Sequence, residues 1–289
     1  MTWRTILITR QSKLSYKNGY LVVRNEEAKM IHLSEINTLL IDSTDITFSV
    51  FLFSELLKNK IKIVLCDEQH NPQGEVVPYY GKFNGTKAVQ NQVKWIKEDT
   101  DLIWTDIIYQ KILNQSIMLK RLELDNSDKL EGYLKELKMG DSTNREGHAA
   151  KVYFNTLFGK GFSRDKEIDI NAALNYGYSI ILSNFNKEIV SLGYLTQIGM
   201  KHINEFNYFN LSCDIMEPFR VLVDETVYRN LGNQFDNSYK VILINLLNEK
   251  LRIDGKEHFL TNAIQIYVRS VFNAIEQKDV SFIKYFEFV

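Results

Sequence analysis

The chain is poor in the residues that mark several protein classes. It has two cysteines, Cys66 and Cys213, and three prolines among 289 residues. Two cysteines without paired spacing exclude a disulfide scaffold, a zinc ribbon and a CxxC redox motif, and they favour a reducing compartment. No apolar run approaches the roughly 20 residues of a membrane span, and no basic start leads into an apolar signal segment. We therefore expect a cytoplasmic protein that is neither exported nor embedded in a membrane.

An excess of charge of one sign is also missing. The chain has 35 basic and 36 acidic side chains, a net charge of -1. No global positive field therefore indicates a polyanionic partner, and any binding of nucleic acid must come from local basic surfaces. The first thirty residues are locally basic, which we interpret as a strand edge kept soluble by its charge.

The first part of the chain has a β-like pattern. Short apolar runs fill the stretch from Trp3 to about Leu65. Asn18-Gly19 stands between two of them, and Asn-Gly is a strong hairpin signal because both central residues of a type I′ turn need positive φ. Residues 47–58 alone show helical spacing. This pattern predicts a small, β-sandwich-like domain with one helix over residues 1–75.

The second part of the chain has a helical pattern. Prolines and glycines gather between Asp67 and Gly85, where we place a linker at residues 76–85. Beyond it, apolar residues recur at three-to-four spacing, for example over residues 102–119. We predict an α+β protein in which residues 86–289 form a larger, all-α catalytic domain.

Glu146 falls on the inward face of a predicted helix. The helix starts near Asp141, with Ser142, Thr143 or Asn144 as its cap. Steps of three or four residues from Glu146 give an apolar stripe of Ala149, Ala150, Tyr153 and Leu157. A carboxylate on such a stripe is costly unless a positive group meets it. A helix-capping acid is the alternative interpretation, and His148 points to nearly the opposite side.

Two later segments supply an imidazole and two more carboxylates. His202 ends a stretch in which Leu195, Ile198 and Gly199 precede it at helical intervals, so either a ligand or an ordinary core histidine is compatible with the pattern. Asp214 and Glu217 stand three apart before Pro218, which is typical of a helix start. There both acids can face one side at the positive end of the helix dipole, although a plain N-terminal acidic pair explains them equally.

Glu146, His202 and Glu217 together form a mixed set of oxygen and nitrogen donors. Such a set suits Mg²⁺ or Mn²⁺ with positions left for phosphate oxygens and water. Asp214 is a secondary acidic group beside it. Local spacing does not say whether the three segments converge.

Four blocks of sequence resemble one family in order. Residues 144–159 (NREGHAAKVYFNTLFG) are similar to the first signature of the CRISPR-associated spacer-acquisition integrase, a metal-dependent endonuclease. Residues 171–178 (NAALNYGY), the region of His202 with its two Phe-Asn pairs, and residues 214–220 (DIMEPFR) resemble the later blocks. The opening Trp3-Arg4 and residues 13–18 (KLSYKN) resemble the form that accompanies type II CRISPR systems.

This resemblance implies an activity, a site and partners. Its metal ligands fall on Glu146, His202 and Glu217, with Asp214 as an acidic neighbour. A 3′-hydroxyl of a short foreign duplex would attack a phosphodiester of the CRISPR repeat, a transesterification. A homodimer joined through the β domains, a small ferredoxin-like partner protein and contact with other type II proteins are also implied. The alternatives are a metal-dependent nuclease acting on branched or foreign DNA and a non-catalytic scaffold that clamps DNA.

Basic residues near the second and fourth blocks are candidates for contact with DNA. Lys160, Arg164 and Lys166 surround Gly159-Lys-Gly161 and form either part of a phosphate-binding stripe or a charged surface loop. Arg220 could contact phosphate or pair with Glu217 or Asp214. We expect Tyr176 and Tyr178 to pack in the core rather than to take part in catalysis.

Overall fold

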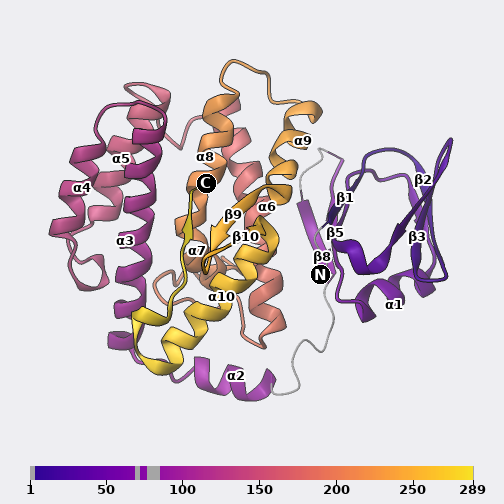
Figure 1. Cartoon of the computed structure of the whole chain (residues 1–289), viewed down its shortest axis with the longest axis horizontal. Helices are drawn as coiled ribbons and strands as arrows, with labels where there is room; N and C mark the ends of the chain where they lie inside the picture. The colour runs from indigo at the N-terminus through magenta and orange to yellow at the C-terminus, as the bar shows by residue number, and fades with distance from the viewer. Residues whose placement is uncertain (1–3, 69–71, 77–84, 289) are drawn as a thin grey trace.

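The N-terminal part of the protein contains two small sheets and one helix. In a computed structural model, residues 4–68, 72–76 and 85–288 are described. The elements are β1 (Arg4–Ile8), β2 (Ser12–Lys17), β3 (Tyr20–Arg24), β4 (Ala28–His32), β5 (Ile36–Ile41), β6 (Ile46–Phe48), α1 (Val50–Lys58), β7 (Lys62–Cys66) and β8 (Pro72–Val76). The strand orders are β1-β5-β7-β8 and β4-β3-β2-β6. Figure 1 shows the two sheets on the right, with α1 beneath them.

This part has its own core. Leu39 of one sheet, Leu14 and Leu21 of the other, and Leu52 and Leu56 of α1 belong to one buried cluster. The predicted hairpin is also present, since Asn18 (φ 47°) and Gly19 (φ 86°) join β2 to β3. The β-sandwich-like domain with one helix is therefore confirmed.

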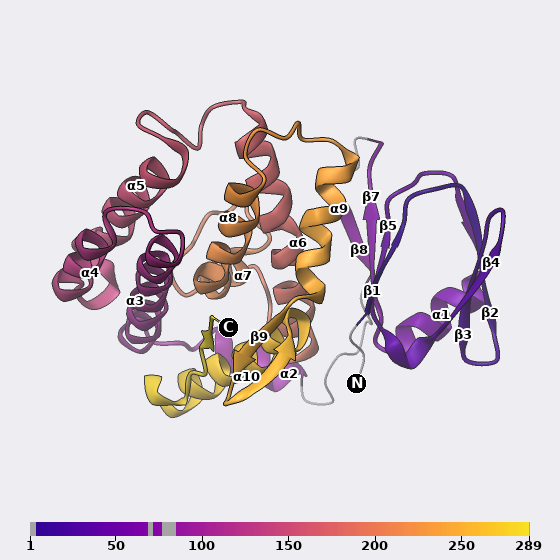
Figure 2. The same cartoon turned by 45° about the horizontal axis from the view of Figure 1, so that its top comes forward.

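The rest of the chain is mainly helical. Its helices are α2 (Gly85–Gln92), α3 (Lys97–Arg121), α4 (Ser127–Glu136), α5 (Arg145–Phe158), α6 (Asp169–Ser191), α7 (Asn210–Met216), α8 (Arg220–Arg229), α9 (Asn237–Asn245) and α10 (Leu260–Gln277). Figure 2 shows α6 between α8 and α9, close to the middle of the molecule. Within the described ranges, no helix combines the length and apolar character needed to cross a membrane.

The helical part also contains a small sheet that the expected all-α domain did not include. The strands β9 (Lys250–Ile253), β10 (Lys256–Phe259) and β11 (Phe286–Glu287) form it in the antiparallel order β10-β9-β11. These strands have four residues or fewer, too few for an alternation of apolar and polar residues to be distinguished from a helical pattern. The tight turn between β9 and β10 uses Asp254 and Gly255, both at positive φ.

One face of the first sheet packs on the helical part. Leu40 of β5 and Val64 of β7 belong to the same buried cluster as the helical core. Lys62 Nζ of β7 donates to the carbonyl of Ser183 on α6. In return, Lys187 Nζ of α6 donates to Asn37 O at 3.2 Å and to Asn37 Oδ1 at 2.9 Å. The linker predicted for residues 76–85 falls mostly on residues 77–84, outside the described residues.

Candidate metal centre

The start of α5 places Glu146. Asn144 precedes the helix in the left-handed region, with φ 52°, and its side chain makes no capping hydrogen bond. Asn144 thus stands at the N-cap position, one of the three residues predicted, but its side chain does not cap the helix. Asp141 takes that role, because its carboxylate accepts the backbone N–H groups of Arg145 at 2.7 Å and Glu146 at 3.1 Å.

The inward face of α5 is as predicted, and a positive group meets its carboxylate. Ala149, Tyr153 and Leu157 are buried. One turn earlier, Glu146 Oε1 lies 2.6 Å from Lys111 Nζ of α3. His148 is exposed, on the other side of the helix. The cost of placing Glu146 on this face is therefore offset by an ion pair across two helices.

Glu217 is the most buried of the three predicted ligands. It begins a 3₁₀ turn (Glu217–Phe219) between α7 and α8, with Pro218 at the start of the turn as predicted. Its Oε2 lies 2.6 Å from Lys111 Nζ, and its Oε1 accepts from Arg220 Nε at 2.8 Å. Burial alone would raise the pKa of Glu217, but the charges of Arg220 and Lys111 outweigh burial and lower the pKa to about 2. Glu217 is therefore ionised at neutral pH.

His202 does not lie on a helix, contrary to the expectation. It belongs to the irregular connection between α6 and α7. The chain comes close to itself at Gly199, where an added Cβ would stand 2.3 Å from His202 O and 2.8 Å from Asp214 Oδ2. The helical spacing of apolar residues before His202 was therefore misleading.

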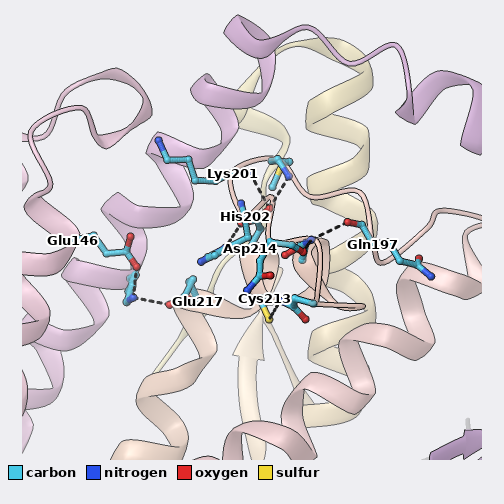
Figure 3. A network of polar contacts seen from close by, with 12 residues as sticks. Glu146, Gln197, Lys201, His202, Cys213, Asp214 and Glu217 are labelled. Atoms are coloured by element: carbon cyan, nitrogen blue, oxygen red, sulfur yellow. Dashed lines mark hydrogen bonds and ion pairs between the residues drawn. The ribbon is translucent and has the colours of Figure 1, made fainter. Parts of the chain in front are cut away.

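Asp214 organises that connection. It lies inside α7, fully buried, and not at a helix start as predicted, since α7 begins at Asn210. Its carboxylate accepts the backbone N–H groups of Met200 (2.6 Å), Lys201 (3.0 Å) and His202 (3.1 Å). It also lies 2.5 Å from His202 Nδ1. Asp214 thus fixes both the loop and the orientation of the imidazole, as shown in Figure 3.

The hydrogen bond with Asp214 determines the state of His202. It raises the pKa of the imidazole, and the charges of Asp214, Glu217 and Glu146 act in the same direction. The ring stands edge-on to Trp104, 5.8 Å between centroids. Because Nδ1 faces Asp214, Nε2 is the nitrogen left for a ligand role.

The three predicted ligands come from different segments and face one region, as Figure 3 shows for Glu146, Glu217 and His202. Lys111 joins the two glutamates there. Within the described ranges, no three His, Cys, Asp or Glu side chains are already grouped to hold a metal ion. The donor set nevertheless fits one, because two carboxylates, one of them held ionised in a buried place, and an imidazole are ligands that suit a divalent cation. A cation would therefore take the place of the Lys111 ammonium.

The basic candidates separate in the structure. Lys160 is exposed and lines a groove of about 560 Å³ together with Lys129 and Lys151. Arg164 instead donates to Asn171 Oδ1 at 2.8 Å, and Lys166 Nζ donates to Gly161 O at 2.8 Å. Arg220 pairs with Glu217, one of the two options left open by the sequence.

Lys111 is the functional residue that the sequence interpretation missed. A signal for it existed, because Lys111 follows Trp104, Ile107 and Ile108 at helical intervals, and all three are buried. A lysine on a buried stripe indicates an acidic partner for the same reason that Glu146 indicated a basic one.

Comparison with known proteins agrees with this architecture. The family model for CRISPR associated protein Cas1 matches residues 6–238. A CRISPR-associated endonuclease Cas1 of Neisseria meningitidis is 33% identical over 270 residues, which cover 91% of this chain and 88% of that protein. A second one, from Francisella tularensis subsp. novicida, is 26% identical over 284 residues, 87% of this chain and 89% of that protein.

Solved structures share the fold. A Cas1 protein from Thermotoga maritima superposes with a TM-score of 0.72 at 16% identity, over 94% of this chain and 97% of that one. A casposase bound to integration product gives a TM-score of 0.68 at 20% identity, over 96% and 92% of the two chains. At these identities the likeness concerns the fold alone. Because the family match spans most of the residues, the chain belongs to the Cas1 family of CRISPR-associated proteins.

Proposed function

We propose that this protein is a metal-dependent DNA integrase and endonuclease of CRISPR adaptation. In this reaction, a 3′-hydroxyl of a short foreign duplex attacks a phosphodiester of the CRISPR repeat. A new P–O bond forms to the incoming strand, the P–O bond to the repeat strand breaks, and the proton of the attacking hydroxyl passes to solvent while the leaving oxygen is protonated. The relative in Neisseria is named an endonuclease, and the structural neighbour described above is a casposase bound to integration product, which supports both halves of this chemistry.

The observation that supports the proposal is that Glu146 and Glu217 each lie 2.6 Å from Lys111 Nζ, with His202 on the same side of them in Figure 3. In the proposed active state, the two carboxylates and His202 Nε2 hold Mg²⁺ or Mn²⁺. Such an ion stabilises charge on the phosphorus and lowers the pKa of the attacking hydroxyl. Asp214 keeps the imidazole turned toward the acids, and Arg220 holds Glu217 in place from the other side.

We further propose that the protein acts on double-stranded DNA as a homodimer with a small ferredoxin-like partner protein. A structural neighbour that this chain covers over 97% of its length, at a TM-score of 0.66, belongs to a Cas6-RT-Cas1–Cas2 complex. Lys160 and Lys166 are both exposed and remain candidates for phosphate contact, although Lys166 Nζ donates to Gly161 O at the surface, whereas Arg164 would have to leave its hydrogen bond with Asn171.

The test compares the wild type with Glu217→Gln, which keeps the shape of the side chain and removes its charge. Purified protein and partner are incubated with a labelled short duplex and a repeat-bearing plasmid, with and without Mn²⁺. We expect metal-stimulated joining by the wild type and none by Glu217→Gln, with circular dichroism unchanged. Full joining by the variant would exclude Glu217 as a ligand.

The same assay separates the two alternatives. A nuclease that does not integrate would shorten the labelled duplex without producing joined product, and this loss would also need the metal. A scaffold would join only through another component, so any product would be independent of metal and insensitive to the substitution. Thermal melts of Glu146→Ala and His202→Ala complete the test, because a purely structural role predicts unfolding without a specific loss of metal response.

A further inference from the structure

A buried carboxylate lies behind the candidate metal centre and is not among its ligands. Asp224 is on α8, one helical turn after Arg220, and its exposed fraction is 1%. Two hydroxyl groups from other helices donate to it, that of Tyr153 on α5 at 3.1 Å and that of Tyr178 on α6. Asp224 therefore joins α8 to α5, which carries Glu146, and to α6.

The Tyr178 ring connects Asp224 to the centre. The Arg220 guanidinium lies 4.7 Å from the centroid of this ring, a cation–π contact, while Arg220 Nε donates to Glu217 Oε1. Tyr178 can tilt little, because its hydroxyl is held by Asp224 and the ring is buried. Tyr178 and Asp224 therefore fix the position of Arg220, and Arg220 in turn fixes that of Glu217.

The charges of Arg220, Glu217 and Asp224 also link Asp224 to the centre. The charge of Arg220 acts on two carboxylates, that of Glu217 and that of Asp224, which follows Arg220 by one helical turn. With Asp224 ionised, the charge of Arg220 is shared between them. With Asp224 neutral, the full charge of Arg220 would act on Glu217, and less negative potential would be left at that carboxylate for a divalent cation.

We propose that Asp224 and Tyr178 are positioning residues of the metal centre. They hold Arg220 against Glu217 Oε1, which leaves Glu217 Oε2 turned toward Lys111 and the incoming divalent cation. The inference rests on the proposed function, since it assumes that Glu217 is a ligand. Outer groups that orient ligands typically change metal affinity by 10- to 100-fold when they are removed, which sets the expected scale.

Tyr153 provides a matched control. Tyr153→Phe and Tyr178→Phe each remove one hydrogen bond to Asp224, but of these two rings only that of Tyr178 makes a cation–π contact with Arg220. Tyr178→Leu removes the ring as well, and Asp224→Asn removes the charge. Mn²⁺ affinity is measured without DNA, by electron paramagnetic resonance of the free ion, alongside thermal melts of each variant.

We expect Tyr178→Leu and Asp224→Asn to weaken Mn²⁺ binding roughly tenfold or more, and Tyr153→Phe to change it less than about twofold even if it lowers the melting temperature. Unaltered affinity in Tyr178→Leu would overturn the inference, as would an equal loss in Tyr153→Phe, which would indicate a general effect of the core. If Asp224→Asn does not fold, the Tyr178 and Tyr153 variants decide. Absence of Mn²⁺ binding by the wild type would instead refute the proposed function.

Discussion

Replacement of Lys111 by methionine tests the centre most directly. Lys111 Nζ lies 2.6 Å from a carboxylate oxygen of both Glu146 and Glu217, and its side chain is 12% exposed. Burial alone would lower the pKa of Lys111, but the charges of Glu217 and Glu146 outweigh it and raise the pKa. Methionine keeps most of the apolar stem and removes the charge, so the two acids lose the cation they share.

The expected loss of stability follows from the burial of Glu217, which is 4% exposed. Removal of one partner of a buried ion pair typically costs about 3 to 5 kcal/mol, because the remaining charge is left uncompensated. Arg220 still pairs with Glu217, so we take the lower value, roughly 3 kcal/mol. For a chain of this size that corresponds to a fall in melting temperature of roughly 6 to 12 °C in the presence of a chelator.

Divalent cation should restore much of this loss. An ion present at one hundred times its dissociation constant stabilises the folded state by about 2.7 kcal/mol. The wild type should gain less from the same Mn²⁺ concentration, because the ion must first displace the ammonium of Lys111. The measurement is a pair of thermal melts, with chelator and with Mn²⁺, for the wild type and Lys111→Met.

A double variant, Lys111→Met with Glu146→Gln, controls for the charge. It should recover part of the stability without cation and lose the response to Mn²⁺, because one ligand is gone. Two results would refute the reasoning. One is a Lys111→Met protein as stable as the wild type in chelator, and the other is an equal gain from Mn²⁺ in both proteins.

Three further predictions concern the surrounding fold. Asp141→Ala should cost about 1 kcal/mol of unfolding free energy in urea, and Asp141→Asn less, because this carboxylate caps α5. Gly177→Ala should lower the unfolding free energy by about 2 kcal/mol, since its Cβ would stand 2.4 Å from Val223 Cγ1. Gly132→Ala, whose Cβ would have nothing within 4 Å, should raise the unfolding free energy by up to about 1 kcal/mol in the same urea titrations. Burial lowers the pKa of Lys187 from 10.5 to about 8, so protonation of Lys187 destabilises the folded state. The unfolding free energy of the wild type should therefore rise by up to about 3 kcal/mol from pH 8 to 10.5, and that of Lys187→Met should not.

The elements that sequence predicted well are those whose signal is local. Asn18-Gly19 dictates a hairpin through backbone conformation alone, and the stripe through Ala149, Tyr153 and Leu157 follows from helical periodicity. Glu146 could be singled out on that stripe, because a carboxylate on an apolar face is unfavourable unless a positive group lies beside it. The sequence could not name the partner, since Lys111 lies on a separate helix 35 positions away.

The errors arise where tertiary contacts override the local pattern. The apolar spacing before His202 favours a helix, yet Asp214 draws the backbone of this segment into a turn by accepting three of its N–H groups. These three hydrogen bonds stabilise the segment more than one turn of helix would, because each is made to a buried, charged acceptor. Asp214 itself lies inside α7 and not at a helix start. Its spacing of three residues from Glu217 could not reveal this.

The charges at the centre also explain how the protein can fold before it binds a metal. Lys111 and Arg220 are placed to offset Glu146 and Glu217, so the acids do not require a divalent ion to become buried. This differs from small metal domains, in which the ion supplies the free energy of folding. If the protein acts as proposed, metal binding would exchange one cation for another, and the affinity would depend on how readily Lys111 can leave. A chelator should therefore abolish joining while it leaves the melting temperature of the wild type nearly unchanged, and unfolding by the chelator would show that the ion, not Lys111, holds the two acids together.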